Sequence, residues 1–401
     1  MHPSEAIFCA RSEKLKGKRI VVGVTGSIAA VETVKLIREL IRHGADVFPL
    51  MSPEAKNIVH PNVLEFASGK KPVIDVGGDV PYIQLLEGKK KADLYIIAPC
   101  TSNTLSKIAW GVSDTIVTLF ATQGFGLKIP LILVPSMHIP MYENPIMKSN
   151  IRTLKKLGVE FIDPKVEESA AKLPGIEEMV AKVIRKVGQD AGALKGKKVI
   201  VIGGSNKEPI DDVRFVSAYS TGATAVELAR NAFEMGADVQ LLMGRCEVQM
   251  PGHIPTKRFE TVGDLLKLVP KLKCDICLVP AALSDYTPVK TRGKISSRYK
   301  GLILELKAQP KVIELIRRNR KCFLVGFKAE YRISVSELEK RASERLQSAR
   351  LDMIVANDIA KIEPEKNEII IIRKKGKKET FKGTRAQLAD RIMAAVADGA
   401  R

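Results

Sequence analysis

Residues 194–206 read LKGKKVIVIGGSN. A charged lead-in precedes a short stretch at 198–202 that reads as a buried strand, and a turn of small residues follows it. This order is typical of the first βα unit of a nucleotide-binding domain, where a buried strand runs into a Gly/Ser turn. The stretch therefore predicts an α/β domain that begins near residue 195.

The same pattern occurs near the start of the chain, where residues 15–27 read LKGKRIVVGVTGS. Similar segments follow both copies. GADV at 44–47 recurs at 236–239, and ADLYIIAP at 92–99 is similar to CDICLVP at 274–280. Repetition on this scale favours two tandem domains over a solenoid. We expect a first domain over residues 1–190, a second over 191–401, and a linker at 188–196.

The 401 residues, 45% of them apolar, suffice for two ordinary cores. No apolar run approaches the roughly 20 residues of a membrane span, and residues 1–18 lack the apolar core of a signal peptide. The six cysteines are scattered, unlike a secreted disulfide framework. We therefore expect a cytoplasmic protein with reduced cysteines. Cys274 and Cys277 form a CxxC without a second pair or a His cluster nearby, which does not favour a metal site.

The formal net charge is +20, from 65 basic and 45 acidic residues, and raises the question of nucleic-acid binding. The basic runs are spread along the chain, and aromatic residues make up only 5%, so no stacking platform is visible. Solvated faces and anionic small ligands explain the charge more simply. We expect small-molecule partners and neither nucleic acid nor a membrane.

Three polar segments of the first half follow predicted strands. Gly26-Ser27 ends the first strand, Thr101-Ser102-Asn103-Thr104 follows a strand near 93–98, and His138 lies in a loop, PSMHIPMYENP, after the strand at 131–134. Ligands of open α/β sheets bind at this edge. Plainer explanations stay open for each: a glycine needed for a tight turn, helix capping by one hydroxyl, and a surface histidine.

Together, GVTGSIAA, the Pro99–Thr104 loop and PSMHIPMY resemble the flavin-dependent cysteine decarboxylases that act on 4'-phosphopantothenoylcysteine, over about residues 15–185. The resemblance implies a flavodoxin-like domain in which FMN oxidises the cysteinyl thiol so that CO2 can leave, and then returns the electrons. It places substrate at Met137 and His138. It implies FMN contacts from Gly26, Ser27, Ser52, Ser102, Asn103 and Thr104.

This first half departs from the family pattern at the expected base. The family carries an essential His in a His-Ile-x-Leu segment before the strand at 93–98, whereas this chain has Tyr82 there. Tyrosine is a poor proton acceptor near neutral pH because its reference pKa is near 10. His60 and His138 are the alternative candidates for the base. His138 in place of the bacterial Asn, and EESAAKLP at 167–174 in place of a Cys-containing flap, resemble archaeal members.

The second half continues with GGSNKEPIDDVRF, PAALSDYTP, GKISS, QPKVIELI and VGFKAEY in this order. On their own, the GGS turn of Gly203, Gly204 and Ser205 and the strand ends indicate a Rossmann-like phosphate or nucleotide site, without the GxGxxG of a dinucleotide site. The ordered set resembles phosphopantothenate-cysteine ligase. The expected fold is thus α/β, with two tandem Rossmann-like three-layer domains.

The ligase resemblance implies that CTP with Mg2+ activates 4'-phosphopantothenate as an acyl-cytidylate, which the amine of cysteine then attacks. Lys294 would stabilise the charge that develops during transfer, while Asp211 and Arg214 would approach phosphate or substrate. Arg214 as a plain surface charge stays an alternative. No metal ligands from the protein itself are expected. The expected nucleotide contacts are Gly203, Gly204, Ser205, Ala281, Ala282, Asp285, Lys294 and Phe327.

One catalytic position of this half departs from the family. The family has Asn where this chain has Ala218, and a methyl group can neither donate nor accept a hydrogen bond. An unpaired buried partner would cost roughly 1–3 kcal/mol, or about 10- to 100-fold in rate. We therefore expect a bifunctional enzyme of coenzyme A biosynthesis with two activities that Tyr82 and Ala218 impair, assembled as flavoprotein trimers joined through ligase dimers. The alternative is a flavin-binding regulatory protein without turnover.

Overall fold

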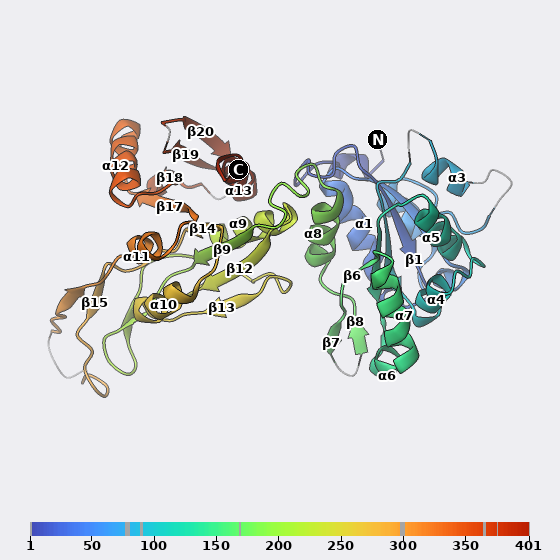
Figure 1. The fold of residues 1–401 in the computed structure, drawn as a ribbon, viewed down its shortest axis with the longest axis horizontal. Coiled ribbons are helices and arrows are strands. Elements are labelled where there is room, and N and C mark those ends of the chain that lie inside the picture. Colours follow the sequence, from blue (N-terminus) through green and yellow to red (C-terminus); the bar gives the residue numbers. More distant parts are fainter. Residues whose placement is uncertain are drawn as a thin grey trace. The chain divides into compact units, whose positions relative to one another are not determined.

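The computed structural model describes residues 2–76, 81–88, 91–167, 170–296, 301–363, 366–374 and 376–400. It divides into two compact units, Met1–Ala191 and Gly192–Arg401 (Figure 1). Each is an α/β unit with a wholly or mainly parallel sheet between helices, so the predicted fold class is confirmed. Within the described ranges, no helix has the length and apolar character needed to cross a membrane.

The first unit is built on a five-stranded parallel sheet in the order β2-β1-β3-β4-β6. Its elements are η1 Glu5–Ile7, β1 Arg19–Val24, η2 Ile28–Glu32, α1 Thr33–Arg42, β2 Asp46–Met51, η3 Pro53–Asn57, α2 Pro61–Ser68, α3 Pro81–Leu86, β3 Leu94–Cys100, α4 Ser102–Ala109, α5 Ile116–Gly126, β4 Leu131–Pro135, β5 Met137–His138, α6 Ile139–Glu143, α7 Pro145–Lys156, β6 Glu160–Phe161, β7 Lys165–Glu167, β8 Ala170–Lys172 and α8 Ile176–Val187. This is the flavodoxin-like strand order.

Two apolar cores lie on the two faces of this sheet. Alternation along β1 sends Ile20, Val22 and Val24 to one core with α1, α2 and α8, and Val21 to the other with α3, α4, α5 and α7. The three-layer arrangement follows from strands that are apolar on both sides. Close packing is strict at Gly23, where a Cβ would lie 2.5 Å from the Tyr95 hydroxyl.

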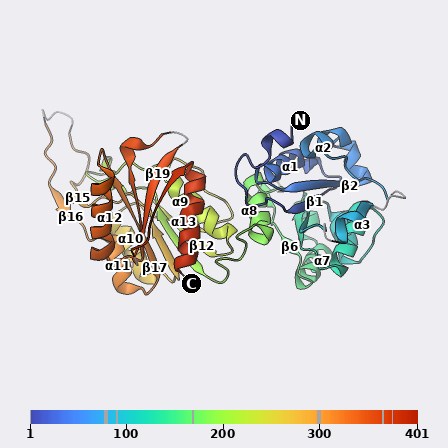
Figure 2. The same cartoon turned by 90° about the horizontal axis from the view of Figure 1, so that it is seen from above.

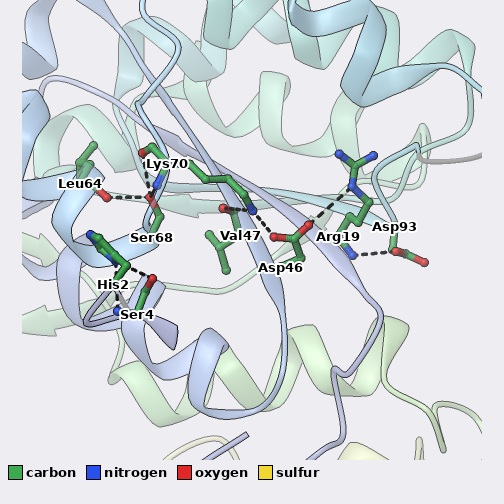
Figure 3. A network of polar contacts seen from close by, with 9 residues as sticks. All are labelled: His2, Ser4, Arg19, Asp46, Val47, Leu64, Ser68, Lys70 and Asp93. Atoms are coloured by element: carbon green, nitrogen blue, oxygen red, sulfur yellow. Dashed lines mark hydrogen bonds and ion pairs between the residues drawn. The ribbon is translucent and has the colours of Figure 1, made fainter. Parts of the chain in front are cut away.

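Charged side chains fix the amino-terminal ends of the central strands (Figure 3). Asp93 accepts a hydrogen bond from the backbone N–H of Arg19 at 2.8 Å, and the Arg19 guanidinium lies 3.9 Å from Asp46. Lys70 pairs with the same Asp46 and donates to the carbonyl of Val47 at 3.3 Å. These contacts align β1, β2 and β3 at one edge and leave the carboxyl-terminal edge for the candidate site.

The second unit contains an eight-stranded sheet in the order β13-β12-β9-β14-β17-β18-β19-β20. Its elements are β9 Lys198–Gly203, β10 Glu208–Pro209, β11 Phe215–Val216, α9 Ala223–Glu234, β12 Asp238–Met243, β13 Thr256–Arg258, α10 Val262–Leu268, η4 Val269–Lys271, β14 Ile276–Val279, β15 Tyr286–Pro288, β16 Leu306–Ala308, α11 Val312–Asn319, β17 Phe323–Glu330, α12 Val335–Ser348, β18 Met353–Asp358, η5 Ile359–Lys361, β19 Asn367–Arg373, β20 Lys378–Gly383 and α13 Arg385–Gly399. The sheet is parallel through β18, and β19 and β20 join antiparallel.

Helices again cover both faces of the sheet. Helices α9 and α13 share one core, and α10, α11 and α12 share the other (Figure 2). Outside the main sheet, β10 pairs with β11 and β15 pairs with β16, each antiparallel. These two small ladders carry the long loops that follow β9 and β14.

The sequence repeat corresponds to a repeat in hydrogen bonding. Asp93 N donates to Arg19 O, and its carboxylate accepts from Arg19 N; Asp275 makes the same two bonds with Lys198. The strand orders β2-β1-β3-β4 and β12-β9-β14-β17 also agree. The similar segments at 92–99 and 274–280 therefore form equivalent strands, β3 and β14.

Candidate functional sites

The first candidate site is a cavity of about 950 Å³ at the carboxyl-terminal ends of β1, β3 and β4. Strand order reverses between β1 and β3, which is where open α/β sheets bind ligands. Its lining combines small and polar groups with apolar side chains and two lysines. The lining residues are Gly26, Ser27, Ile28, Ala29, Val31, Glu32, Thr101, Ser102, Asn103, Ser136, Met137, His138, Met141, Lys165, Lys172, Leu173, Pro174, Gly175 and Ile176.

Hydroxyl groups join the three strand ends around this cavity. Thr25 Oγ1 donates to the carbonyl of Pro99 at 2.7 Å and accepts from the backbone N–H of Thr101 at 3.1 Å. Ser27 Oγ lies 3.1 Å from Ser136 Oγ, which links the ends of β1 and β4. The turn after β1 is thereby fixed relative to the loops after β3 and β4.

Gly26 is required by packing as well as by any ligand. A Cβ at this position would lie 2.6 Å from Glu54 Cβ, so η3 leaves no room for a side chain. Ser27 caps η2 by accepting from Ala29 N, and Thr101 caps α4 by accepting from Thr104 N. The plain explanations noted from sequence thus hold for Gly26 and Thr101, alongside their places in the cavity wall.

Six of the predicted residues lie together in the wall: Gly26, Ser27, Ser102, Asn103, Met137 and His138. Ser52 is buried and caps η3, and Thr104 is buried behind Thr101, so these two are not among the lining residues. His60 caps α2 away from the lining. Tyr82 belongs to α3, but its side chain lies outside the described part, and its catalytic role stays a prediction.

The second candidate site is a cavity of about 330 Å³ between the end of β14, the start of α11 and the second half of β17. Predicted residues Ala281, Ala282, Asp285 and Phe327 line it. Lys311, Lys328 and Arg345 bring positive charge to the wall, each with a carboxylate partner: Asp285 for Lys311, Glu330 at 3.0 Å for Lys328 and Glu314 at 3.1 Å for Arg345.

The Gly203-Gly204-Ser205 turn is hydrogen-bonded to the loop that bears Ala281 and Ala282. Gly204 O accepts from Ala282 N at 2.9 Å, and Ser205 is fully buried. A Cβ on Gly203 would lie 2.1 Å from Ala225 Cβ, and Gly204 has a φ of +76°. The turn residues therefore hold the cavity loop in place, but they are not among the lining residues of the cavity.

The same loop is held by a buried polar chain. Asn206 Oδ1 accepts from Ser284 N at 2.8 Å, and Asn206 Nδ2 donates to Glu208 Oε1 at 2.8 Å. Glu208 also accepts from Val262 N at 2.9 Å and from Thr287 Oγ1 at 2.7 Å. This carboxylate connects the segment after β9 with α10 and β15.

Asp211 and Arg214 fix the loop that carries Lys294. Asp211 accepts hydrogen bonds from the backbone N–H groups of Val213, Arg214 and Ile295, at 2.8, 2.6 and 3.1 Å. Arg214 Nη2 donates to Ile295 O at 3.3 Å. Burial raises the pKa of the Asp211 carboxyl, but these N–H donors and Arg214 outweigh it, so the pKa is lowered.

Lys294 and Ala218 lie outside the lining of the second cavity. Lys294 is exposed, and Ala218 is half-buried next to Ser217, whose hydroxyl donates to Asn206 O at 2.7 Å.

Three lining residues of the second cavity were not predicted from the sequence: Lys311, Lys328 and Arg345. Lys311 and Lys328 stand inside the QPKVIELI and VGFKAEY motifs, which could have indicated them, whereas Arg345 carried no such signal. Among the described residues, no cluster of His, Cys, Asp or Glu could hold a metal ion.

Fold and sites together define a tandem α/β protein with a ligand cavity at the strand ends of each half. The family profile named Flavoprotein matches residues 9–188, and the profile named DNA/pantothenate metabolism flavoprotein C-terminal domain matches residues 194–399. These matches identify the first unit as a flavoprotein.

Curated relatives extend this likeness to the whole chain. The coenzyme A biosynthesis bifunctional protein CoaBC of Thermococcus kodakarensis is 40% identical over 400 residues, with 98% of each chain covered. The CoaBC of Methanocaldococcus jannaschii is 38% identical, with 98% of this chain and 96% of that one covered. A solved C-terminal domain of a CoaBC is 27% identical, with a TM-score of 0.44, over 51% of this chain and 96% of that chain. The chain belongs to the family of coenzyme A biosynthesis bifunctional proteins. The alternative of a regulatory protein without turnover is not favoured.

Proposed function

This bifunctional coenzyme A biosynthesis enzyme has two activities, and we propose that each unit carries one of them. The first unit is the phosphopantothenoylcysteine decarboxylase, and the second unit is the phosphopantothenate-cysteine ligase. The observation that carries this division is the cavity after β1, β3 and β4, because it lies within the residues matched by the flavoprotein profile. The product of the ligase is then the substrate of the decarboxylase.

The first cavity fits FMN by the chemistry of its wall. The hydroxyls of Ser27 and Ser102 and the amide of Asn103 offer hydrogen bonds to phosphate and ribityl oxygens, and Ile28, Ala29 and Met141 offer apolar contacts to a ring system. When bound, FMN accepts two electrons reversibly, so that the net reaction is redox neutral: the carboxylate leaves as CO2 and a proton takes its place on carbon. His138, exposed in the wall, is the described histidine that could move that proton.

In the second unit, CTP with its Mg2+ is the proposed co-substrate. The carboxylate of 4'-phosphopantothenate attacks the α-phosphorus of CTP, and pyrophosphate leaves. The amine of cysteine then attacks the acyl carbon, and CMP and a proton leave as the amide forms. Lys311, Lys328 and Arg345 line the cavity and would face the anionic nucleotide, and Phe327 would contact its base or ribose.

Purified protein should show a flavin spectrum with FMN, and should release CMP when given 4'-phosphopantothenate, CTP, Mg2+ and cysteine. It should also release CO2 from 4'-phosphopantothenoylcysteine added directly. Absence of a flavin spectrum after reconstitution would refute the assignment of the first unit. Failure to release CMP would refute that of the second.

Replacement of Ala218 by Asn should raise the rate of CMP release by about 10-fold or more, because the amide restores a donor and an acceptor beside Ser217. Steady-state CMP release from wild type and variant at saturating substrates tests this. Ala218→Leu, which adds bulk without a polar group, is the matched control and should give no gain. An equal rate for Ala218→Asn and wild type would show that this position contacts no intermediate.

We also propose a homo-oligomer. Ile28, Trp110 and Ile146 of the first unit are large apolar residues with 77%, 77% and 68% of their surface exposed in the single chain. Apolar side chains this exposed are often covered by a partner. Flavoprotein trimers joined through ligase dimers are the assembly we propose.

A further inference from the structure

The flavoprotein cavity has one cationic wall. Lys165 of β7 and Lys172 of β8 both line the cavity, and the antiparallel register places them directly opposite each other. Two ammonium groups at such a position can both contact one anion that lies between them. Burial raises the pKa of the Glu178 carboxyl of α8, and the nearby charges of Lys182 and Lys165 partly offset that rise.

The same small sheet carries His138. Strand β5 pairs with β8 so that His138 is opposite Ala170, two residues from Lys172 along β8. Side chains two residues apart share a face of a strand, so His138, Lys172 and Lys165 lie on one face of the sheet β5-β8-β7. Figure 1 shows β7 and β8 as a hairpin beside α6. Elsewhere, Ser27, Ser102 and Asn103 of the wall are uncharged, and the carboxylate of Glu32 is paired with Lys35 at 2.9 Å.

The substrate offers two anionic groups to this wall, a carboxylate and a phosphate. The carboxylate loses its charge as CO2 departs, so a lysine on it would stabilise the ground state more than the transition state and slow the reaction. The phosphate keeps its charge throughout, so a lysine pair can bind it without that penalty. Its binding energy also serves to hold the reacting end in place.

We propose that Lys165 and Lys172 bind the phosphate of the substrate and so select the phosphorylated cysteine conjugate over its dephosphorylated form. The inference rests on the proposed decarboxylase function of the first unit. The lysine pair is a specificity device on the β7-β8 hairpin, separate from the residues proposed to hold FMN.

The test compares 4'-phosphopantothenoylcysteine with pantothenoylcysteine in full-length, FMN-loaded protein. For the phosphorylated compound, Lys165→Gln and Lys172→Gln should each lower kcat/KM for CO2 release by about 10-fold, and the double variant by up to about 100-fold. For pantothenoylcysteine, the same variants should match wild type. Lys156→Gln, an exposed lysine of α7 outside the lining, is the control and should change neither value.

Dissociation constants for both compounds, measured by calorimetry, separate this inference from the proposed function because they do not require turnover. Loss of affinity for the phosphorylated compound alone supports the inference. Equal losses for both compounds, loss of the flavin spectrum, or no change in the double variant would each overturn it. A wild type that binds both compounds but releases no CO2 would overturn the proposed function and leave the phosphate selectivity measurable.

Discussion

Replacement of Glu208 by Ala should lower the free energy of unfolding of the second unit by about 3 kcal/mol. Glu208 is 3% exposed, and its carboxylate accepts hydrogen bonds from Val262 N, Asn206 Nδ2 and Thr287 Oγ1. Its removal leaves these donors without their acceptor in a region that water reaches poorly. Asn206 would then lose its orientation toward Ser284 N, and the cavity loop would loosen.

Amide hydrogen exchange of the full-length protein, read by mass spectrometry on peptides from 262–268 and 282–288, measures this effect locally. Both peptides should exchange faster, and CMP release should fall with them. Glu208→Gln, which keeps one acceptor, should lie between wild type and Glu208→Ala. Glu260→Ala removes an exposed carboxylate from the neighbouring segment and serves as control. Unchanged exchange in Glu208→Ala would show that water replaces the carboxylate at little cost.

Much of the fold could be predicted from the sequence because local signals and tertiary packing agree. The expected strands at 131–134 and 198–202 coincide to within one residue with β4 and β9, since each buried apolar run ends at a Pro or Gly. Helix α4 begins at Ser102 because Thr101 caps it, as the explanation of helix capping by one hydroxyl predicts. The antiparallel strands β19 and β20 were not predicted. Their residues 367–383 have no counterpart in the repeat on which the prediction rested.

The site was less predictable, because lining a cavity depends on contacts far along the chain. Strand-end residues such as Ser102 and Ala281 were found, since the edge of a parallel sheet is recognisable from sequence. Lys165 and Lys172 were missed because a short hairpin, without strong periodicity, brings them to the cavity. Arg345 was missed because it lies in the last turn of α12, a helix rich in charged residues that usually face solvent.

Replacement of Asp211 by Ala should lower the rate of CMP release by about 100-fold. The carboxylate accepts three backbone hydrogen bonds, one of them from Ile295, so its removal frees the loop that carries Lys294. These three charge-assisted bonds hold the loop on which Lys294 is proposed to stabilise the developing charge, so their loss should weaken that stabilisation. We expect the loss in kcat, with the KM for 4'-phosphopantothenate nearly unchanged.

Two readouts distinguish this positioning role from direct substrate contact. Positioning predicts faster amide exchange at 293–296 in Asp211→Ala even without substrate, whereas substrate contact predicts unchanged exchange and a raised KM. The control, Asp238→Asn, alters an exposed carboxylate at the start of β12.

A pH series gives a further check on the role of the Asp211 carboxylate. Because the folded-state pKa of Asp211 is below the unfolded value near 4, its stabilisation is complete above that value and is lost as the pH falls through the folded pKa. The difference in exchange between wild type and Asp211→Asn should therefore be constant above about pH 5 and shrink below about pH 4. A difference that persisted unchanged into stronger acid would mean that the ionised carboxylate does not hold the loop.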